Sequence, residues 1–163
     1  MNKDFTIRTA TPADYNAVGS LTWDLLFELS PEWVAEQSRE TYVETSNTLL
    51  SKGENFWALV AEFNGDIIAT LNINECAAIY AGGAFGEISE FYIKPEFRSK
   101  GVGAGLIEAA KSFGADKGWT ILEVGAPSPE QWQRTIDFYL KNGFTAIGPR
   151  LEIILPVQQS PPA

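Results

Sequence analysis

The sequence predicts a single α/β domain of the α+β kind, with a mixed central sheet and helices on both faces. The chain has 163 residues, of which 45% are hydrophobic, and that is enough to bury one core. Stretches of alternating apolar residues are interspersed with stretches of helical periodicity, with no repeat or linker between them. We therefore expect one domain over residues 1–155. The tail "PVQQSPPA" (156–163) has the composition of a disordered segment.

The N-terminal third is predicted to form a strand and two helices. "FTIR" (5–8) alternates like a short strand. "TPAD" (11–14) has the features of a helix start, because Thr can cap and Pro suits the first helical position. Pro31 ends that helix, and a second helical stretch covers about residues 32–51.

The middle of the chain is predicted to form strands. "NFWALVAEF" (55–63) and "DIIATLNIN" (66–74) are joined by Asn64-Gly65, a pair that favours the tight turn of a hairpin. "YAGGAFG" (80–86) has the composition of a mobile loop. "EISEFYI" (87–93) then alternates like a strand, which Pro95 ends.

Two further helices and two strands are predicted in the C-terminal part. A helix with one apolar face follows the glycines at 101–105 and ends at Gly118. "WTILEV" (119–124) is a strand, and "SPEQ" (128–131) is a capping box that begins a helix. "LEIIL" (151–155) is the last predicted strand.

Composition excludes several classes of function. The formal charge of -9 argues against binding to nucleic acid or an anionic membrane, and it either attracts cations or only keeps the chain soluble. With no histidine and one cysteine, Cys76, the chain has no Ser-His-Asp triad, no histidine metal site and no internal disulfide. No metal is expected. The sequence shows no signal peptide and no membrane-spanning run, so we expect a cytoplasmic protein.

"RSKGVGAG" (98–105) lies between a strand end and a helix start. Unpaired N–H groups in the first turn of a helix attract anions, and glycine lets a phosphate approach the backbone. Arg98 and Lys100 add positive charge. The spacing fits neither the dinucleotide fingerprint nor a P-loop. By itself the stretch is compatible with a phosphate cradle or with a plain glycine turn.

The wider stretch "EISEFYIKPEFRSKGVG" resembles the signature of the GNAT superfamily of acyl-CoA N-acyltransferases, whose core here is Arg98 to Gly103. The second signature of that superfamily, an aromatic-Tyr pair followed by Gly-Phe, corresponds to "FYLKNGF" (138–144). The two motifs together span about residues 85–147. The N-terminal half matches only in the order of its elements.

This resemblance implies a site for acetyl-CoA. The backbone amides of residues 98–104 would hold the pyrophosphate, and residues 91–93 would pair with the pantetheine arm between splayed parallel strands at 87–93 and 119–124. Where the family often has an asparagine, this chain has Trp132, which puts a side-chain bond to the pantetheine in doubt and makes a core position the alternative. The implied cofactor-binding residues are Phe91, Tyr92, Ile93, Arg98, Ser99, Lys100, Gly101, Val102, Gly103 and Ala104.

The implied chemistry needs a base for the amine and an acid for the departing thiolate. Glu87 and Glu90 match acidic positions of different family branches, and a β-bulge could bring both to the site although a regular strand would separate them. Which glutamate is the base stays open. Tyr139 is the candidate acid, and a buried aromatic residue is the alternative reading of that position. Cys76 lacks an activating partner in the sequence, so a covalent route through it is disfavoured.

The sequence therefore predicts an acetyl-CoA-dependent N-acetyltransferase that acts by direct attack of a primary amine. The acceptor is expected to be neutral or cationic, and either a small molecule or a peptide or protein amine. A catalytically silent acyl-CoA-binding module on the same fold is the alternative, and homodimer formation and the length of the short acyl group are left open. Aromatic residues expected near the acceptor, or in the core, are Trp23, Phe27, Trp33 and Tyr80.

Overall fold

The computed structural model describes residues 4–156, which form one twisted five-stranded sheet with helices packed on it. The strands follow chain order across the sheet. The first four are antiparallel to their neighbours, whereas the fourth and fifth run parallel. The mixed sheet is thus confirmed. Its strands are β1 (Thr6–Thr9), β2 (Phe56–Phe63), β3 (Asp66–Ala78), β4 (Gly83–Ile93) and β5 (Leu122–Val124).

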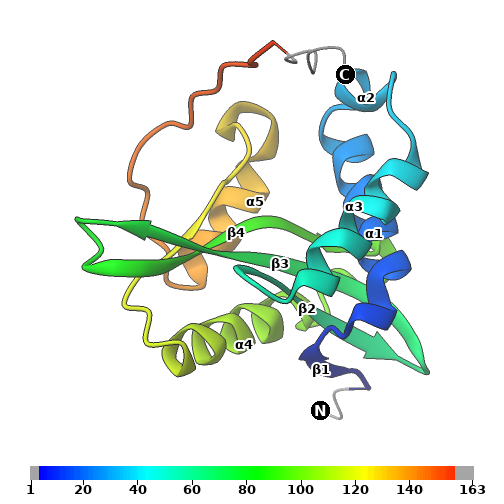
Figure 1. The fold of residues 1–163 in the computed structure, drawn as a ribbon, viewed down its shortest axis with the longest axis horizontal. Helices are drawn as coiled ribbons and strands as arrows, with labels where there is room; N and C mark the ends of the chain where they lie inside the picture. The colour runs from blue at the N-terminus through cyan, green and yellow to red at the C-terminus, as the bar shows by residue number, and fades with distance from the viewer. Residues whose placement is uncertain (1–3, 157–163) are drawn as a thin grey trace, which may run out of the picture.

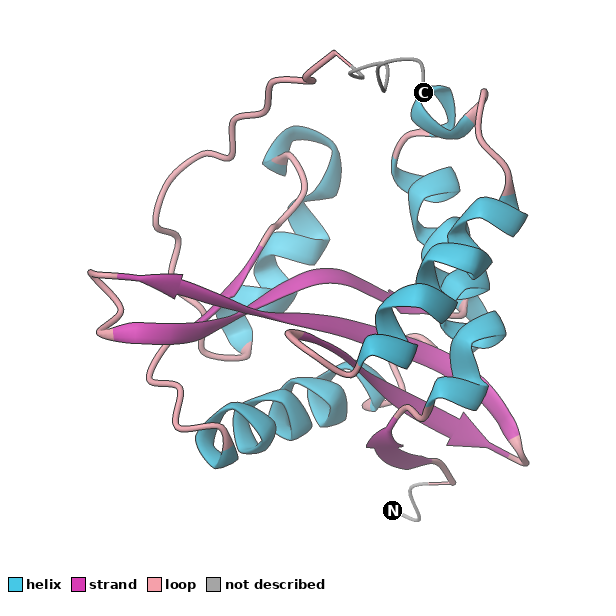
Figure 2. Cartoon of the chain, viewed as in Figure 1, coloured by secondary structure: helices cyan, strands magenta, loops and turns pink. Residues whose placement is uncertain are grey.

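Helices cover both faces of the sheet, as Figures 1 and 2 show: α1 and α3 pack on one face and α4 lies across the other. Among residues 4–156, no helix is long and apolar enough to cross a membrane. The helices are α1 (Tyr15–Leu29), α2 (Pro31–Val34), α3 (Arg39–Lys52), α4 (Val102–Asp116) and α5 (Pro129–Lys141), and single 3-10 turns lie at η1 (Pro12–Asp14) and η2 (Pro95–Phe97).

Strand β2 shows how one strand serves two cores. Its side chains alternate between the faces of the sheet. Leu59 and Ala61 belong to the larger core under α4, whereas Ala58 and Val60 belong to the smaller core under α1 and α3. All four are buried. This burial on both faces explains why "ALVA" is a continuous apolar run.

The turn between β2 and β3 forms as predicted, whereas the segment between β3 and β4 differs from the prediction. Asn64 and Gly65 both have positive φ, at 51° and 83°, and join β2 to β3 as predicted. The segment 80–86, expected to be a mobile loop, instead contributes its last residues to β4, where Gly83 pairs with Ala78. Small residues there have low strand propensity, but the long partner strand β3 supplies the pairing.

Two predicted elements, a helix in the N-terminal third and a strand in the C-terminal part, are divided or shortened. The helical stretch 32–51 is two helices, because Ser38 caps α3 by accepting a hydrogen bond from the Thr41 amide at 3.2 Å. The strand 119–124 begins only at Leu122. The side-chain hydrogen bond expected of Ser128 at the start of α5 is not formed.

The predicted strand 151–155 is wrong. The segment lies outside the sheet as an extended coil, and Leu151 and Ile153 are 90% and 82% exposed. The chain passes around α5 (Figure 1) and leaves a space of about 1440 Å³ between itself, β5 and α5. A strand needs a partner edge, which propensity alone cannot supply. Of the predicted tail 156–163, all but Pro156 lie outside the described residues.

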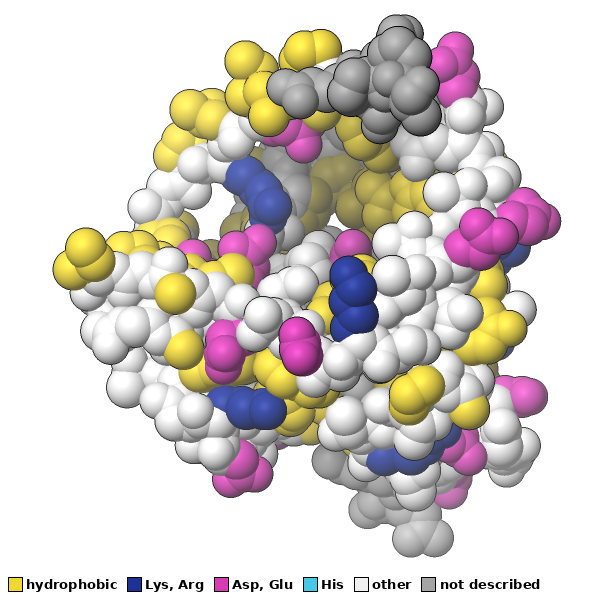
Figure 3. Space-filling view, in the orientation of Figure 1, with side chains coloured by type: hydrophobic (Ala, Val, Ile, Leu, Met, Phe, Trp, Pro, Cys, Tyr) yellow, Lys and Arg dark blue, Asp and Glu magenta, His cyan; other side chains and the backbone are white. Residues whose placement is uncertain are grey.

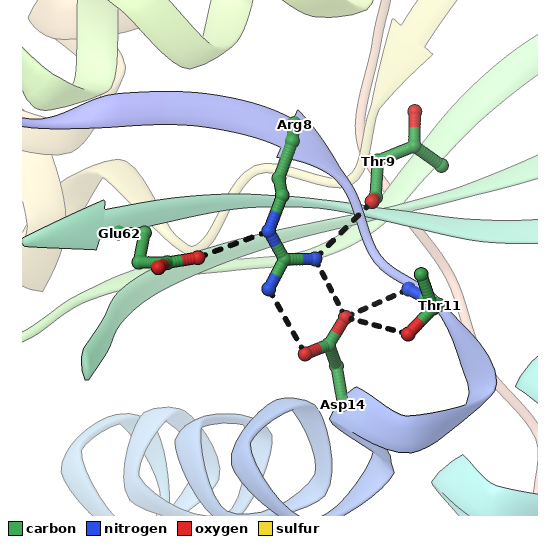
Figure 4. A network of polar contacts seen from close by, with 5 residues as sticks. All are labelled: Arg8, Thr9, Thr11, Asp14 and Glu62. Atoms are coloured by element: carbon green, nitrogen blue, oxygen red, sulfur yellow. Dashed lines mark hydrogen bonds and ion pairs between the residues drawn. The ribbon is translucent and has the colours of Figure 1, made fainter. Parts of the chain in front are cut away.

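A polar network ties β1, η1 and β2 together (Figure 4). Arg8 donates two hydrogen bonds to the Asp14 carboxylate, at 2.7 and 3.0 Å, and a third to Glu62 at 3.0 Å. Asp14 also accepts from the backbone and side chain of Thr11. The guanidinium of Arg8 thereby lowers the pKa of Asp14, against the opposing effect of its burial.

This network predicts a pH-dependent contribution to stability. A carboxyl group whose folded pKa is depressed stabilises the fold above its unfolded pKa and loses that contribution as pH falls through the folded value. We expect Asp14→Asn to lose about 1 kcal/mol at neutral pH. The difference from the unaltered chain should shrink below about pH 4. Urea unfolding across this pH range measures it, and a constant difference at all pH values would contradict the assignment.

Candidate active site

A cleft opens where β4 and β5 separate. The strands pair over three residues only, and Ile88–Val124 is the last pair. Beyond it the Gly125 amide approaches the Ile88 carbonyl at 3.4 Å, and the strands then diverge. The resulting cleft has a volume of about 750 Å³ and is lined by β4, α1, α5 and the start of α4. The expected splaying of parallel strands is present, with a shorter paired region than the sequence suggested.

The glycine-rich stretch forms the entrance to α4 at one end of this cleft. Ser99 and Gly101 both have positive φ, at 59° and 86°, and Val102 is the first residue of the helix. The first hydrogen bond of the helix runs from the Gly105 amide to the Gly101 carbonyl at 3.0 Å. The amides of the first turn therefore have no carbonyl partner within the helix, which suits an anion.

The two glycines flanking Val102 have different surroundings. A Cβ on Gly101 would meet nothing within 4 Å, so this backbone faces open space. A Cβ on Gly103 would lie 3.0 Å from the Phe138 ring and 3.2 Å from Ile93. Gly103 is buried, and its missing side chain lets α4 pack against α5 and β4. Substitution of Gly103 would therefore disturb packing before it tested ligand access.

Of the two cations expected beside the glycines, Arg98 is paired with a carboxylate and Lys100 is exposed. Arg98 donates to both carboxylate oxygens of Glu28, at 2.9 and 2.8 Å, and to the Ile93 carbonyl at 2.9 Å. Glu28 raises the pKa of Arg98 and offsets its charge. Lys100 is exposed, with its ammonium 5.8 Å from the Phe97 ring centre. The sequence pattern did not reveal Glu28, because it lies in a distant helix.

Arg134 is a cleft residue that the sequence analysis missed. Its guanidinium donates to the Ser99 hydroxyl at 3.1 Å and so reaches the glycine-rich turn from α5. Arg134 precedes Phe138 by four residues, and residues at this spacing share a helix face. Since Phe138 packs at Gly103, that spacing is the signal that places Arg134 at the same end of the cleft.

A β-bulge in β4 brings the two candidate glutamates to one face of the sheet. Asn72 of β3 pairs with Glu90, but the next residue of β3 pairs with Ile88, so Ser89 is the extra residue. Ile88 is buried in the core under α4, which places Glu87 on the opposite face. Glu90 shares that face, because it hydrogen-bonds through Asn72 to Thr22 of α1.

The surroundings of the two glutamates differ. Glu90 lines the cleft, and its Oε2 accepts hydrogen bonds from Asn72 at 3.1 Å and from Ser89 at 2.6 Å. Glu87 lines the neighbouring space under the C-terminal segment, beside Glu123 and 3.6 Å from Arg150. The bulge therefore aligns the glutamates without placing them in identical positions.

Tyr139 lies in the wall between the two spaces and lines both. Its side chain is 7% exposed, and its ring packs against Phe91, Phe138 and Phe144. Burial raises the pKa of Tyr139 to about 12, so the hydroxyl stays protonated at neutral pH. Within residues 4–156 this hydroxyl has no hydrogen-bond partner. Tyr139 is thus a core aromatic residue whose protonated hydroxyl lies at the cleft.

The structure also places two other residues considered from the sequence, Cys76 and Trp132. Burial, followed by the charges of Glu87 and Glu123, raises the pKa of Cys76, which disfavours its thiolate as a nucleophile. Trp132 is half-buried, lines the cleft and has non-helical backbone angles that kink α5, so the core reading of this residue is wrong. Residues 4–156 contain no acidic or cysteine cluster able to hold a metal ion.

The aromatic residues considered for an acceptor pocket divide into two groups. Trp23 packs edge-on against Tyr42 at 5.2 Å. Phe27 and Trp33 are 59% and 49% exposed, and Tyr80 is 68% exposed and donates a 2.6 Å hydrogen bond to Glu123. Most of this set is therefore available at the surface rather than committed to the core.

Comparisons with known proteins agree with this geometry. Solved structures with the same fold include an aminoglycoside acetyltransferase, meta-AAC0020, from an uncultured soil metagenomic sample (19% identity, 96% of this chain and 99% of that one, TM-score 0.72). A ribosomal-protein-alanine N-acetyltransferase from Brucella melitensis biovar Abortus 2308 has 18% identity, with 93% and 99% covered and a TM-score of 0.72. A predicted acetyltransferase with acetyl-CoA from Clostridium acetobutylicum has 20% identity, with 92% and 96% covered and a TM-score of 0.75.

Sequence comparison identifies the family. The search of curated proteins found no matching relative. The family model for the acetyltransferase (GNAT) domain matches residues 52–146, which include β4, the glycine-rich turn, the whole of α5 with Tyr139, and Phe144 after it. More than half of the chain is covered by this match, and the chain belongs to the GNAT acetyltransferase family.

Proposed function

We propose that this protein transfers the acetyl group of acetyl-CoA to a primary amine by direct attack. One observation carries the proposal: a single cleft contains both the first turn of α4, where an anion can bind, and the side chains of Glu90 and Tyr139, which can move protons. A module that only bound acyl-CoA would need the first feature without the second.

The cleft residues fit the parts of acetyl-CoA. The amides that begin α4 suit its pyrophosphate, and Arg134 and Lys100 supply positive charge beside them. The edge of β4 after Ile88 has no strand partner on the side of β5 among the described residues, so residues 91–93 can pair with the extended pantetheine arm. Once bound, acetyl-CoA supplies an activated acetyl thioester.

The proton transfers follow from the positions of the two side chains. Glu90 takes a proton from the attacking amine as the N–C bond forms and the C–S bond breaks. Tyr139 donates to the sulfur as it leaves, and solvent restores the phenol proton. The raised pKa of Tyr139 keeps it in the donor form throughout the neutral range. The raised pKa of Cys76 favours this direct route over an acetyl-cysteine route.

The acceptor is a neutral or cationic amine, and we propose a small molecule. Glu87 and Glu123 lie side by side on β4 and β5, and Tyr80 adds an exposed ring bonded to Glu123. Negative charge next to an aromatic surface suits a cation with an apolar part. The two named acceptors among the structural neighbours, an aminoglycoside and a ribosomal protein, belong to those proteins; the acidic wall of this chain favours the former chemistry.

A turnover assay tests the proposal. The chain is incubated with acetyl-CoA and a panel of cationic, neutral and acidic primary amines, and the released thiol is followed. We expect thiol release with cationic or neutral amines and acetylated product by mass spectrometry. Acetyl-CoA binding without turnover on any amine would favour the silent module, and acetylation of acidic amines alone would contradict the acceptor assignment.

The proposed pyrophosphate site at the start of α4 is tested at Ala104, an exposed residue of the first helical turn. Ala104→Glu places a negative charge beside the phosphates, and we expect the affinity for acetyl-CoA to fall about tenfold. Ala104→Gln has the same size without the charge and should bind normally. A first-turn Glu does not weaken a helix, so folding is preserved. Calorimetry measures both variants, and equal affinities would place the phosphates elsewhere.

Tyr139→Phe tests the proposed acid, because it keeps the packed ring and removes only the hydroxyl. Cofactor affinity should change little, while kcat falls roughly 10- to 1,000-fold. Phe138 is the adjacent aromatic residue without a hydroxyl, and Phe138→Leu serves as a control for packing damage. Steady-state kinetics measure the effect, and full activity in Tyr139→Phe would leave that residue with a packing role alone.

A further inference from the structure

We propose that Asn72 and Ser89 are positioning residues that hold one oxygen of Glu90 and leave its other oxygen to accept the proton of the amine. The inference rests on the proposed function and extends it to residues beyond the predicted catalytic and cofactor-binding set. Both side chains donate to Oε2 of Glu90. Within the described residues Oε1 has no hydrogen-bond partner, so it is the oxygen with full capacity to accept a proton.

The orientation of the Asn72 amide is fixed by its neighbours. Its Oδ1 accepts from the Thr70 hydroxyl at 2.8 Å. Its Nδ2 donates to the Thr22 hydroxyl at 3.0 Å, and that hydroxyl is itself committed to the Val18 carbonyl at 2.9 Å. The second proton on Nδ2 therefore goes to Glu90. A flipped amide would turn its oxygen toward the carboxylate and toward the Thr22 hydroxyl, and would lose both bonds that Nδ2 now donates.

Burial makes this arrangement rigid. Thr70 and Asn72 are 0% and 2% exposed, and Thr22 is 9% exposed. Buried polar groups are costly unless they are bonded, so each member of such a network constrains the next. The chain of contacts begins in α1, crosses β3 and ends at the carboxylate on β4. Glu90 is thus held from the interior of the protein.

Ser89 also donates a hydrogen bond to Oε2 of Glu90. It is the extra residue of the β-bulge, and its hydroxyl donates to Glu90 at 2.6 Å while accepting from Asn74 at 2.8 Å. Without the bulge, adjacent side chains would point to opposite faces of the sheet. The bulge therefore aligns Glu90 and supplies one of its two hydrogen-bond donors.

Uncharged donors hold the Glu90 carboxylate, and among the described residues it forms no ion pair. Asn72 and Thr22 are uncharged, as are the phenols of Tyr42 and Tyr139 at neutral pH, and the Glu28–Arg98 pair is internally neutralised. The charged or ionisable groups that line the cleft, share its face of β4 or pack from α3 are Glu28, Arg98, Arg134, Lys141, Tyr139, Glu87, Tyr92 and Tyr42.

The test compares kcat and KM for four variants and the unaltered chain. Glu90→Gln should abolish most of kcat. Ser89→Ala should lower kcat about tenfold with little change in the KM for acetyl-CoA, because one donor that orients the carboxylate is lost. Asn72→Asp replaces the other donor with a second carboxyl group and should lower kcat further. Ser46→Ala, which removes a buried hydroxyl of α3 that has no partner among the described residues, should leave kcat and KM unchanged.

A second readout separates the inference from the proposed function. Carbon-13 NMR of the glutamate carboxyl groups reports the Glu90 signal directly, with Glu90→Gln used for assignment. A displaced Glu90 signal in Ser89→Ala and Asn72→Asp, but not in Ser46→Ala, supports the network even if no amine is acetylated, in which case the proposed function alone fails. An unchanged signal in both folded variants overturns the inference, and so does a fully active Glu90→Gln.

Discussion

The separation of β4 from β5 is the constraint on which the site depends. Parallel pairing ends after Ile88 and Val124, and the backbone edge that would have paired farther along the strand lines the cleft instead. A continuous sheet would have satisfied that edge and left no room for a ligand. Leaving the edge unpaired is costly only while no ligand or water bonds to it. The cleft is therefore a gap in the secondary structure rather than a hollow between domains.

The elements on either side of the gap keep it open. On one side the long hairpin of β3 and β4 holds the edge rigid through its register over Ala69–Ala78. On the other, α5 packs through Phe138 at Gly103 and through Tyr139 at Phe91. The same aromatic contacts that complete the core set the position of the Tyr139 hydroxyl. The packing role of Tyr139 and the acid role proposed for it therefore depend on the same contacts.

The charge at the cleft differs from the net charge of the chain. The molecule is strongly acidic, at -9, yet the end of the cleft at α4 presents backbone amides and Arg134. Arg98 is bonded to Glu28 and to the Ile93 carbonyl, so its role in this state is to join α1 to the turn after β4. In the neighbouring space, which Tyr139 separates from the cleft, Glu87 and Glu123 concentrate negative charge. The two spaces thus suit the anionic cofactor and the cationic acceptor proposed above.

The sequence by itself determined the family, the order of most elements and the positions of the principal candidates, because these depend on local patterns. Asn64-Gly65 needs only its own backbone preferences to form a turn, and the two family motifs are contiguous stretches. Tertiary structure alone decided what depends on distant partners: Arg134 at Ser99, Glu28 at Arg98 and Asn72 at Glu90 are separated by 35, 70 and 18 residues. It also decided against a strand at 151–155, since an apolar alternating segment becomes a strand only where another edge is there to bond with it.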